Sequence, residues 1–179
     1  EVKKNINYAI LISTNSGLWR YKIGDTIKFT SISPYRIQIS GRTKNFINAF
    51  GEELIIENAE KALTKTLLTH KLNIVEYTVA PFYMNKKKSG HHQWLIEFKN
   101  PPKNLLGFKK DLDVNLQKTN SDYKSKRFKN ITMSEIEIIV ARKNLFYDWL
   151  KKNKKLGGQN KVPRLCNDRK LIEELLKII

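Results

Sequence analysis

The sequence predicts an α+β protein in which helices pack on a small mixed sheet, preceded by a short β-rich segment. Residues 1–40 show strand and turn patterns only, whereas from Glu52 onward apolar residues at helical spacing alternate with strand-like runs. The order after Glu52 is helix, strand, strand, helix, strand, helix, followed by a short final helix. Because a few strands are interleaved with several helices, we expect a small sheet with helices on one face.

The β-rich segment contains three strand-like runs. Residues 8–13 are an apolar run that ends at a turn signal. Residues 26–31 and 36–40 are two short runs on either side of a Ser-Pro turn, which predicts a hairpin. Residues 41–44 then interrupt the strand pattern.

A first helix is predicted near Glu52, where apolar residues begin to recur at spacings of three and four. Its apolar face consists of Ile55, Ala59, Ala62, Leu63 and Leu67. Two strands follow at residues 75–79 and 94–98, and they are separated by a lysine-rich loop and by His91 and His92.

The rest of the chain repeats this alternation. The apolar stripe of a second helix consists of Phe108, Leu112 and Leu116. A third strand is predicted at residues 136–140 and a third helix at residues 145–150. A short final helix is predicted at residues 171–176, with Asn167 or Asp168 as its cap.

The net charge of +17 makes nucleic acid a candidate partner, because a strongly basic protein attracts polyanions. The lysine clusters, however, fall in predicted loops and on polar helix faces, where solvated charge is the ordinary interpretation. The sequence also lacks a stripe of alternating aromatic and basic residues suited to stacking bases. A basic nucleic-acid-binding module is therefore the less favoured alternative.

The composition also bears on location. No apolar run approaches the ~18 residues of a membrane-spanning helix, and the first residues do not lead into an apolar signal region. Cys166, the single cysteine, cannot form an internal disulfide or a cysteine-based zinc site. We expect a cytoplasmic protein without membrane contact.

Several common catalytic motifs are absent, among them the Walker A phosphate loop, the dinucleotide fingerprint and the zinc-protease motif. His91 and His92 are adjacent, but neighbours on a strand point to opposite sides and no carboxylate motif accompanies them. We therefore predict no metal site in this sequence.

Four stretches remain as candidates, and each has an ordinary alternative. Residues 17–25 end in a Gly-Asp pair that suits a turn or a fixed carboxylate for ribose hydroxyls. Residues 41–53 are either a loop or an inter-domain hinge. Residues 120–127 are either a solvated turn or a functional segment. Residues 157–164 hold glycines, a proline, and basic side chains suited to phosphate, although Lys161 alone would be an ordinary exposed lysine.

Together and in this order, these stretches resemble the acyl-acid amido synthetases of the auxin-responsive-promoter family, within the adenylate-forming superfamily. Residues 21–25 look like the ribose-binding strand end of that family, and residues 41–44 look like its hinge. Residues 120–127 are similar to a segment typical of the amido synthetases, and residues 159–164 resemble their carboxyl-terminal lysine loop.

The resemblance implies a two-step reaction that uses ATP and Mg²⁺. A carboxylic acid is first converted to an acyl-adenylate with release of pyrophosphate, and the acyl group then passes to an amine, commonly an amino acid. By the same resemblance, Asp25 holds the ribose hydroxyls, Arg42 lies near the nucleotide and Lys44 is the hinge pivot. Lys161 bridges the acyl carboxylate and the α-phosphate.

Tyr123, Arg127 and Arg164 are candidates for contacts to a substrate or for the second step. An acyl-CoA-type ligase of the same superfamily, which would transfer the acyl group to a thiol, is a second alternative. The two are distinguished by the acceptor that traps the product.

The phosphate loop and the acyl pocket of the superfamily are missing from the sequence, so we expect a carboxyl-terminal fragment that does not catalyse adenylation alone. Residues 1–40 would be the β-rich end of the large adenylation domain. Residues 41–51 would be the hinge, and residues 52–179 the small α+β domain. Mg²⁺ would be bound mainly by the missing amino-terminal domain.

Overall fold

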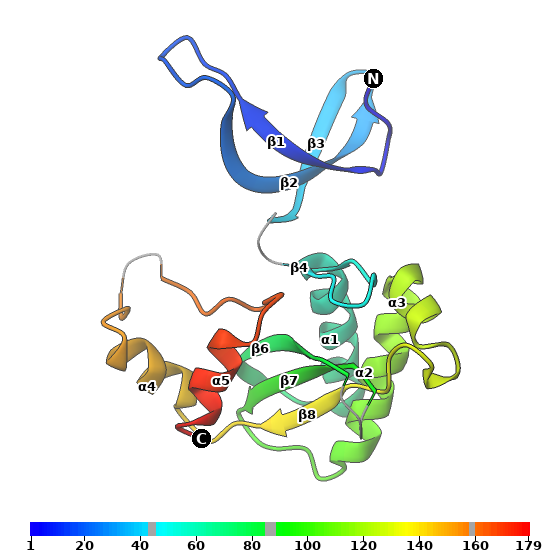
Figure 1. Cartoon of the computed structure of the whole chain (residues 1–179), viewed down its shortest axis with the longest axis vertical. Coiled ribbons are helices and arrows are strands. Elements are labelled where there is room, and N and C mark those ends of the chain that lie inside the picture. The colour runs from blue at the N-terminus through cyan, green and yellow to red at the C-terminus, as the bar shows by residue number, and fades with distance from the viewer. Residues whose placement is uncertain (43–45, 85–88, 158–159) are drawn as a thin grey trace.

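The computed structural model describes residues 1–42, 46–84, 89–157 and 160–179. Within these residues the chain forms three small sheets and five α-helices (Figure 1). This arrangement confirms the α+β class. None of the helices in the described residues is long and apolar enough to span a membrane.

The amino-terminal sheet is an antiparallel meander of β1 (Asn7–Ile12), β2 (Tyr21–Ile32) and β3 (Tyr35–Arg42). The sequence predicted all three strands, but β2 begins five residues earlier than expected and contains the Gly-Asp pair. In the β1–β2 ladder, Ala9 pairs with Thr26 and Leu11 pairs with Lys22. Two steps along β1 therefore correspond to four steps along β2, which is a bulge in β2. Gly24, with φ of 89°, supplies the backbone conformation that this bulge needs. Asp25 thus lies inside a strand rather than at its end.

A short ladder of β4 (Phe46–Ile47) and β5 (Leu54–Ile55) precedes the first helix, α1 (Ile56–His70). The sequence placed the start of this helix near Glu52. Glu53 has a φ of 41°, which an α-helix cannot accommodate, so the helix begins only after the β5 strand.

The central sheet is mixed and has the order β6–β7–β8. The strand β6 (Ile74–Phe82) is antiparallel to β7 (His91–Phe98), and β7 is parallel to β8 (Glu137–Val140). Every residue of β7 is buried, because this strand lies between two neighbours and is covered on both faces. His91 and His92 belong to this strand, which begins three residues earlier than the sequence predicted.

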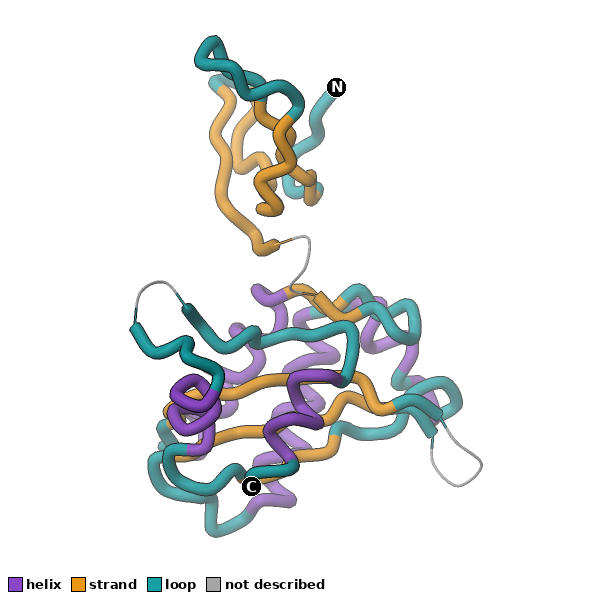
Figure 2. Tube along the Cα trace, turned by 60° about the vertical axis from the view of Figure 1, so that its left-hand side comes forward, coloured by secondary structure: helices purple, strands orange, loops and turns teal. Residues whose placement is uncertain are grey.

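Helices cover both faces of the central sheet, so the expectation of a single covered face is wrong (Figures 1 and 2). One face packs against α1 and α2 (Leu105–Thr119), with Trp94 in the cluster. The other face packs against α4 (Leu145–Lys152) and α5 (Lys170–Leu176), with Leu95 in the cluster. Neighbouring residues of a strand point to opposite faces, and here both faces are apolar.

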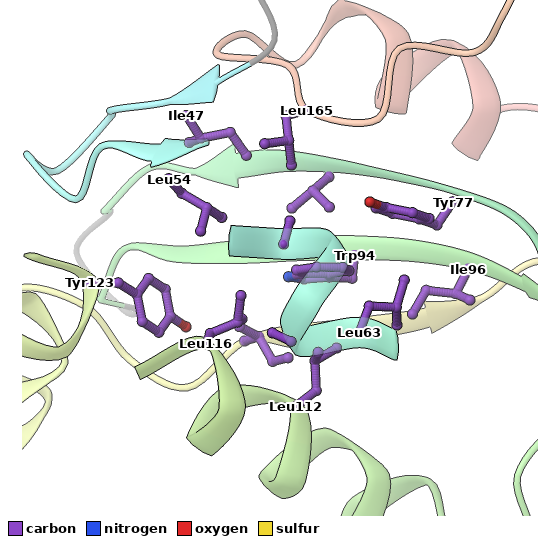
Figure 3. Packing of buried hydrophobic residues seen from close by; sticks show 14 of the residues in the cluster. Ile47, Leu54, Leu63, Tyr77, Trp94, Ile96, Leu112, Leu116, Tyr123 and Leu165 are labelled. Carbon is purple, nitrogen blue, oxygen red and sulfur yellow. The ribbon is translucent and has the colours of Figure 1, made fainter. Parts of the chain in front are cut away.

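The larger core lies between the sheet and the first two helices (Figure 3). Trp94 and Tyr77 stack at its centre, with ring centroids 5.5 Å apart and planes inclined by 14°. Ile47 and Leu54 of the β4–β5 ladder are fully buried in the same core. The ladder therefore belongs to the same packed unit as the central sheet.

Residues 120–127 contain a short helix, α3 (Ser121–Lys126), followed by the 3₁₀ turn η1 (Phe128–Asn130). The solvated-turn alternative for this segment is wrong, because Tyr123 is fully buried. The Asn120 side chain caps α3 by accepting a hydrogen bond of 2.7 Å from the backbone N–H of Tyr123. At α5 the Asp168 side chain accepts from the N–H of Lys170 at 2.9 Å.

Candidate functional site

The segment that follows Lys161 is fixed to the edge of the central sheet. The N–H of Val79 donates to the carbonyl of Arg164 at 2.9 Å, and the N–H of Cys166 donates to the carbonyl of Val79 at 3.0 Å. These two bonds form a parallel bridge between Val79 and Leu165. Thr78 adds a bond of 2.7 Å from its hydroxyl to the carbonyl of Pro163.

The side chains of the same segment reach both hydrophobic cores. Val162 is buried in the cluster under α4 and α5, and Leu165 is buried in the cluster under α1 and α2. With backbone bonds on one strand and apolar anchors on two sides, residues 162–166 behave as an additional edge strand of the sheet.

Arg164 is engaged by acidic residues of the fold. Its guanidinium forms ion pairs with Glu60 of α1 and with Glu76 of β6, the latter at 3.2 Å between Nε and Oε1. It also lies over the ring of Tyr77, with Cζ 5.4 Å from the centroid. Burial lowers the pKa of Arg164, but Glu60 and Glu76 outweigh it, and the pKa lies above its ordinary value. In this arrangement, Arg164 holds the segment against the fold.

Lys161 lies immediately before this anchored segment, and its side chain is exposed. Among the residues that the structure describes, it has no ion-pair or hydrogen-bond partner. A free ammonium on a flexible stem, mounted beside a fixed backbone, can be presented to an anion outside this domain. Phosphate and carboxylate oxygens are the chemical partners that suit it.

A second contact ties the carboxyl-terminal segment to the expected hinge. The N–H of Asn48 donates to Oδ1 of Asn167 at 2.8 Å, and the hydroxyl of Tyr83 donates to the carbonyl of Asn167 at 3.2 Å. These bonds attach the residues that follow Phe46 to the carboxyl-terminal segment and through it to the central sheet.

A buried carboxylate that the sequence gave no signal for organises the loop between β4 and β5. Glu52 is fully buried and accepts hydrogen bonds from the N–H of Phe50 at 2.7 Å and of Ala49 at 3.2 Å. It also meets Nε2 of His92 at 2.7 Å. Its sequence context read as the exposed first turn of a helix, where an acidic residue is ordinary.

The structure brings two of the predicted nucleotide residues together. Asp25 of β2 and Arg42 of β3 are direct partners in the antiparallel ladder. Asp25 is partly buried. Lys44, the predicted pivot, lies outside the described residues. The roles of these three residues stay predictions.

Tyr123 and Arg127 form a network around Asp113, whose part in it the sequence did not reveal. The Tyr123 hydroxyl donates to Oδ1 of Asp113 at 2.7 Å, and Arg127 grips the same carboxylate through Nε at 2.9 Å and Nη2 at 3.0 Å. Arg127 also donates to the carbonyl of Met133 at 2.9 Å. Burial, with the nearby Asp113 charge, raises the pKa of Tyr123 well above its ordinary value. The polar groups of Tyr123 and Arg127 therefore bind other residues of the fold.

Within the described ranges, no group of three or more His, Cys, Asp or Glu side chains could hold a metal ion. His91 and His92 instead meet separate carboxylates. His91 Nε2 lies 3.4 Å from Glu137 Oε2, and His92 pairs with Glu52. This difference follows from their opposite orientations on β7.

Comparison with solved structures shows the same fold in larger proteins. The chain is similar to a structure described as GH3.15 acyl acid amido synthetase, with a TM-score of 0.75 and 20% identity, over 99% of this chain and 34% of that chain. A second, described as AtGH3.15 acyl acid amido synthetase in complex with 2,4-DB, gives a TM-score of 0.73 and 20% identity, over 98% of this chain and 33% of that one. The chain thus spans about a third of the length of these structures.

Comparison with curated protein sequences finds no match. Comparison with family models matches residues 57–170 to the GH3 family C-terminal domain and residues 1–42 to the GH3 family central domain. The first match alone covers more than half of the 179 residues. This result confirms the resemblance found in the sequence, and the chain belongs to the GH3 family.

Proposed function

We propose that the chain is the carboxyl-terminal part of an ATP-dependent acyl-acid amido synthetase. Family membership and the names of the similar structures support this general activity. The observation that carries the proposal is the position of Lys161, an exposed ammonium directly before a segment fixed to the sheet by Val79 and Thr78.

The proposed reaction has two steps. A carboxylate oxygen of the acid attacks the α-phosphorus of ATP, the bond to pyrophosphate breaks, and an acyl-adenylate forms. The lone pair of an amine then attacks the acyl carbon, an amide forms, the amine loses a proton and AMP leaves. The similar structure with 2,4-DB supports a small-molecule carboxylic acid as the first substrate. An amino acid is the proposed amine.

Lys161 would act in the first step. Negative charge is carried there by both the attacking carboxylate and the α-phosphate oxygens, and an ammonium between them offsets their repulsion. Because residues 162–166 are held by backbone hydrogen bonds, the stem of Lys161 starts from a defined position, which reduces the entropy lost on reaching the nucleotide.

The first sheet would contribute to the nucleotide site. Asp25 would accept hydrogen bonds from the two ribose hydroxyls, and Arg42, its partner across the ladder, would lie near the nucleotide. We retain the proposed division into a large-domain part at residues 1–40, a hinge at 41–51 and a small domain at 52–179. Because Ile47 is fully buried in the small-domain core, we place the pivot, with Lys44, before Phe46.

Mg²⁺ would be bound mainly by residues outside this chain, since the described residues offer no cluster that fits it. When bound, it would share the negative charge of the triphosphate. We propose no substrate contact for Tyr123, Arg127 or Arg164, because each of these side chains binds a carboxylate within the fold.

The test is pyrophosphate exchange into ATP by the full-length protein, measured across a panel of carboxylic acids. Lys161→Ala is expected to lower the exchange rate by about 10²–10³, the usual cost of removing a positioned charge donor from such a site. The matched control is Lys151→Ala, an exposed lysine on α4, which should exchange at the wild-type rate.

Full exchange activity in Lys161→Ala would rule out the proposed role. For the second step, the acyl-adenylate is offered either amino acids or coenzyme A. Formation of an amide supports the synthetase, and exclusive formation of a thioester would replace it with the thiol-transferring alternative.

A further inference from the structure

Lys28 and Glu57 form an ion pair between two separately packed parts of the chain. Nζ of Lys28, on β2, lies 2.8 Å from Oε1 and 2.9 Å from Oε2 of Glu57, on α1. Lys28 belongs to the amino-terminal sheet, whereas Glu57 belongs to the part that begins with β4 and is built on the central sheet. We call this second part the central unit. The chain passes from the sheet to the central unit through residues 43–45.

Both partners of this ion pair start from a fixed backbone. β2 is the middle strand of its sheet, and Lys28 pairs with Asn7 of β1 on one side and with Gln38 of β3 on the other. Glu57 lies in the first turn of α1, where the helix dipole favours a carboxylate. The two side chains are only 21% and 22% exposed. The loss of side-chain entropy and the screening by solvent that weaken most surface ion pairs are therefore reduced here.

The Glu57 carboxylate is ionised at neutral pH. Burial raises its pKa, but the hydrogen bonds and charges of Lys28 and Lys61 outweigh this effect, and the pKa lies below the ordinary value of 4.5. Lys61 meets the same carboxylate at 2.7 Å from one turn further along α1. Because Lys61 and Glu57 share a helix, their contact does not connect the sheet to the central unit. Glu57 thus has one lysine partner within its helix and one across the two parts.

The backbone of β3 approaches the start of α1 next to this ion pair. A methyl group on Gly41 would lie 3.1 Å from Cγ2 of Ile56, which is closer than ordinary van der Waals contact. Ile56 directly precedes Glu57 in the chain. The sheet and the central unit are therefore in direct contact here, and the ion pair forms where they meet.

The two parts carry different residues of the proposed reaction. Asp25 and Arg42 lie on the amino-terminal sheet, and Lys161 lies on the central unit. Residues 160–166 are found at the end of the central unit nearest to the sheet (Figures 1 and 2). The position of Lys161 relative to a nucleotide held by the sheet therefore depends on the orientation of one part relative to the other.

We propose that Lys28 and Glu57 are positioning residues, whose ion pair holds the central unit in the orientation seen here and so presents Lys161 to the nucleotide. Neither residue touches the reacting atoms. The contribution to catalysis rests on the proposed synthetase reaction, whereas the fixed orientation does not.

The first experiment measures the orientation in the 179-residue chain. Residual dipolar couplings of the backbone amides give one alignment for β1–β3 and another for β6–β8. We expect a single shared alignment in the wild type, loss of the shared alignment in Lys28→Met, and its retention in the matched control Lys61→Met. A shared alignment in Lys28→Met, or two different alignments in the wild type, would overturn the fixed orientation.

The second experiment exchanges the two charges in the full-length protein. Lys28→Glu and Glu57→Lys each place like charges opposite one another, whereas the double variant restores opposite charges in exchanged positions. Each single variant is expected to lower kcat of pyrophosphate exchange by at least about 5-fold, with little change in KM, and the double variant should recover most of the rate. Lys61→Met should exchange at the wild-type rate. Failure of a folded double variant to recover the rate would refute the positioning role.

The outcomes separate this role from the proposed function. If Lys161→Ala loses exchange while Lys28→Glu retains it, the synthetase reaction stands and the positioning role is rejected. If Lys161→Ala exchanges at the full rate, the proposed role of Lys161 fails, and the contribution of the ion pair to catalysis fails with it. The dipolar couplings decide the orientation in either case.

Discussion

Glu52 and His92 meet at 2.7 Å between Oε1 and Nε2, and neither side chain is exposed to solvent. The contact joins the loop between β4 and β5 to the central strand of the sheet. Asn120 reinforces it by donating to the carbonyls of Glu52 at 2.9 Å and of Glu53 at 3.2 Å. The segment that follows the predicted pivot is therefore held by buried hydrogen bonds as well as by apolar packing.

We expect the pair of Glu52 and His92 to make the free energy of unfolding depend on pH in the acidic range. Burial raises the pKa of Glu52, but His92 and the backbone N–H donors outweigh it, and the pKa lies below the ordinary value of 4.5. The unfolded chain therefore binds a proton at higher pH than the folded chain. The contribution of Glu52 to stability is fully present above pH 4.5 and is lost as pH falls through the lower folded pKa.

The measurement is urea unfolding of the chain at a series of pH values from about 7 to about 3. Glu52→Gln should flatten the acid limb of the stability curve, whereas Glu53→Gln, an exposed neighbour, should preserve it. At neutral pH, Glu52→Ala is expected to cost about 1–3 kcal/mol, because Nε2 of His92 and the N–H groups of Ala49 and Phe50 lose their partner in the core. An acid limb of equal slope in Glu52→Gln would refute this account.

The network around Asp113 gives a second prediction. Arg127→Met leaves the Asp113 carboxylate buried without its cation and is expected to cost about 3–5 kcal/mol of unfolding free energy. Tyr123→Phe removes one hydrogen bond to a charged group and should cost about 1.5–3 kcal/mol. Lys124→Met, an exposed position on the same helix, should change stability little.

Denaturant unfolding of these three variants separates packing from catalysis. If Tyr123 and Arg127 served only the fold, stabilising additives that restore folding would restore acyl transfer by the full-length protein. A variant of either residue that kept full stability but lost acyl transfer would return them to the list of substrate contacts.

Arg164 gives the third prediction, as a positioning residue for Lys161. Its ion pairs with Glu60 and Glu76 are partly exposed, so Arg164→Met should cost no more than about 1 kcal/mol of stability. Loss of the same contacts loosens the segment that carries Lys161 and should lower kcat of pyrophosphate exchange by about 10-fold, with a smaller effect on KM.

The control for Arg164 is Lys61→Met, which removes a surface ion pair of α1 with Glu57 and should leave exchange unchanged. Arg164→Lys retains one charge near both glutamates and should recover part of the rate. If Arg164→Met lowered stability and exchange in step, with KM and kcat both restored at lower temperature, the residue would have only a structural role.

Periodicity was enough to predict the elements but not their polar partners. The strand predicted at residues 75–79 and the helix predicted from the spacing of Ala59 to Leu67 are both confirmed, although burial does not alternate along the strand, since Val75 is exposed and Thr78 is buried. Glu52, Asp113 and Glu97 are different, since each is a buried carboxylate whose partner lies far away in sequence. A carboxylate in a polar-looking stretch carries no local sign of such a partner.

The two-faced sheet was missed for a related reason. The strand β7 is buried throughout, yet it contains His92, Gln93 and Glu97, which weaken the continuous apolar pattern expected of a central strand. Of the candidate site, the sequence suggested Lys161 by its neighbours and Asp25 by its Gly-Asp pair, and the roles of both residues stay predictions. It could not show that Arg164 belongs to the fold, because the two glutamates that hold it lie on α1 and β6.

The attachment of residues 162–166 to β6 also bears on solubility. An uncovered outer strand offers free N–H and C=O groups to other chains, and such edges promote aggregation. Here the bonds of Val79 to Arg164 and Cys166 cover that edge. A variant or a cleavage that detaches residues 162–166 would therefore displace Lys161 and also expose the unpaired edge of β6. Loss of activity and self-association should then appear together.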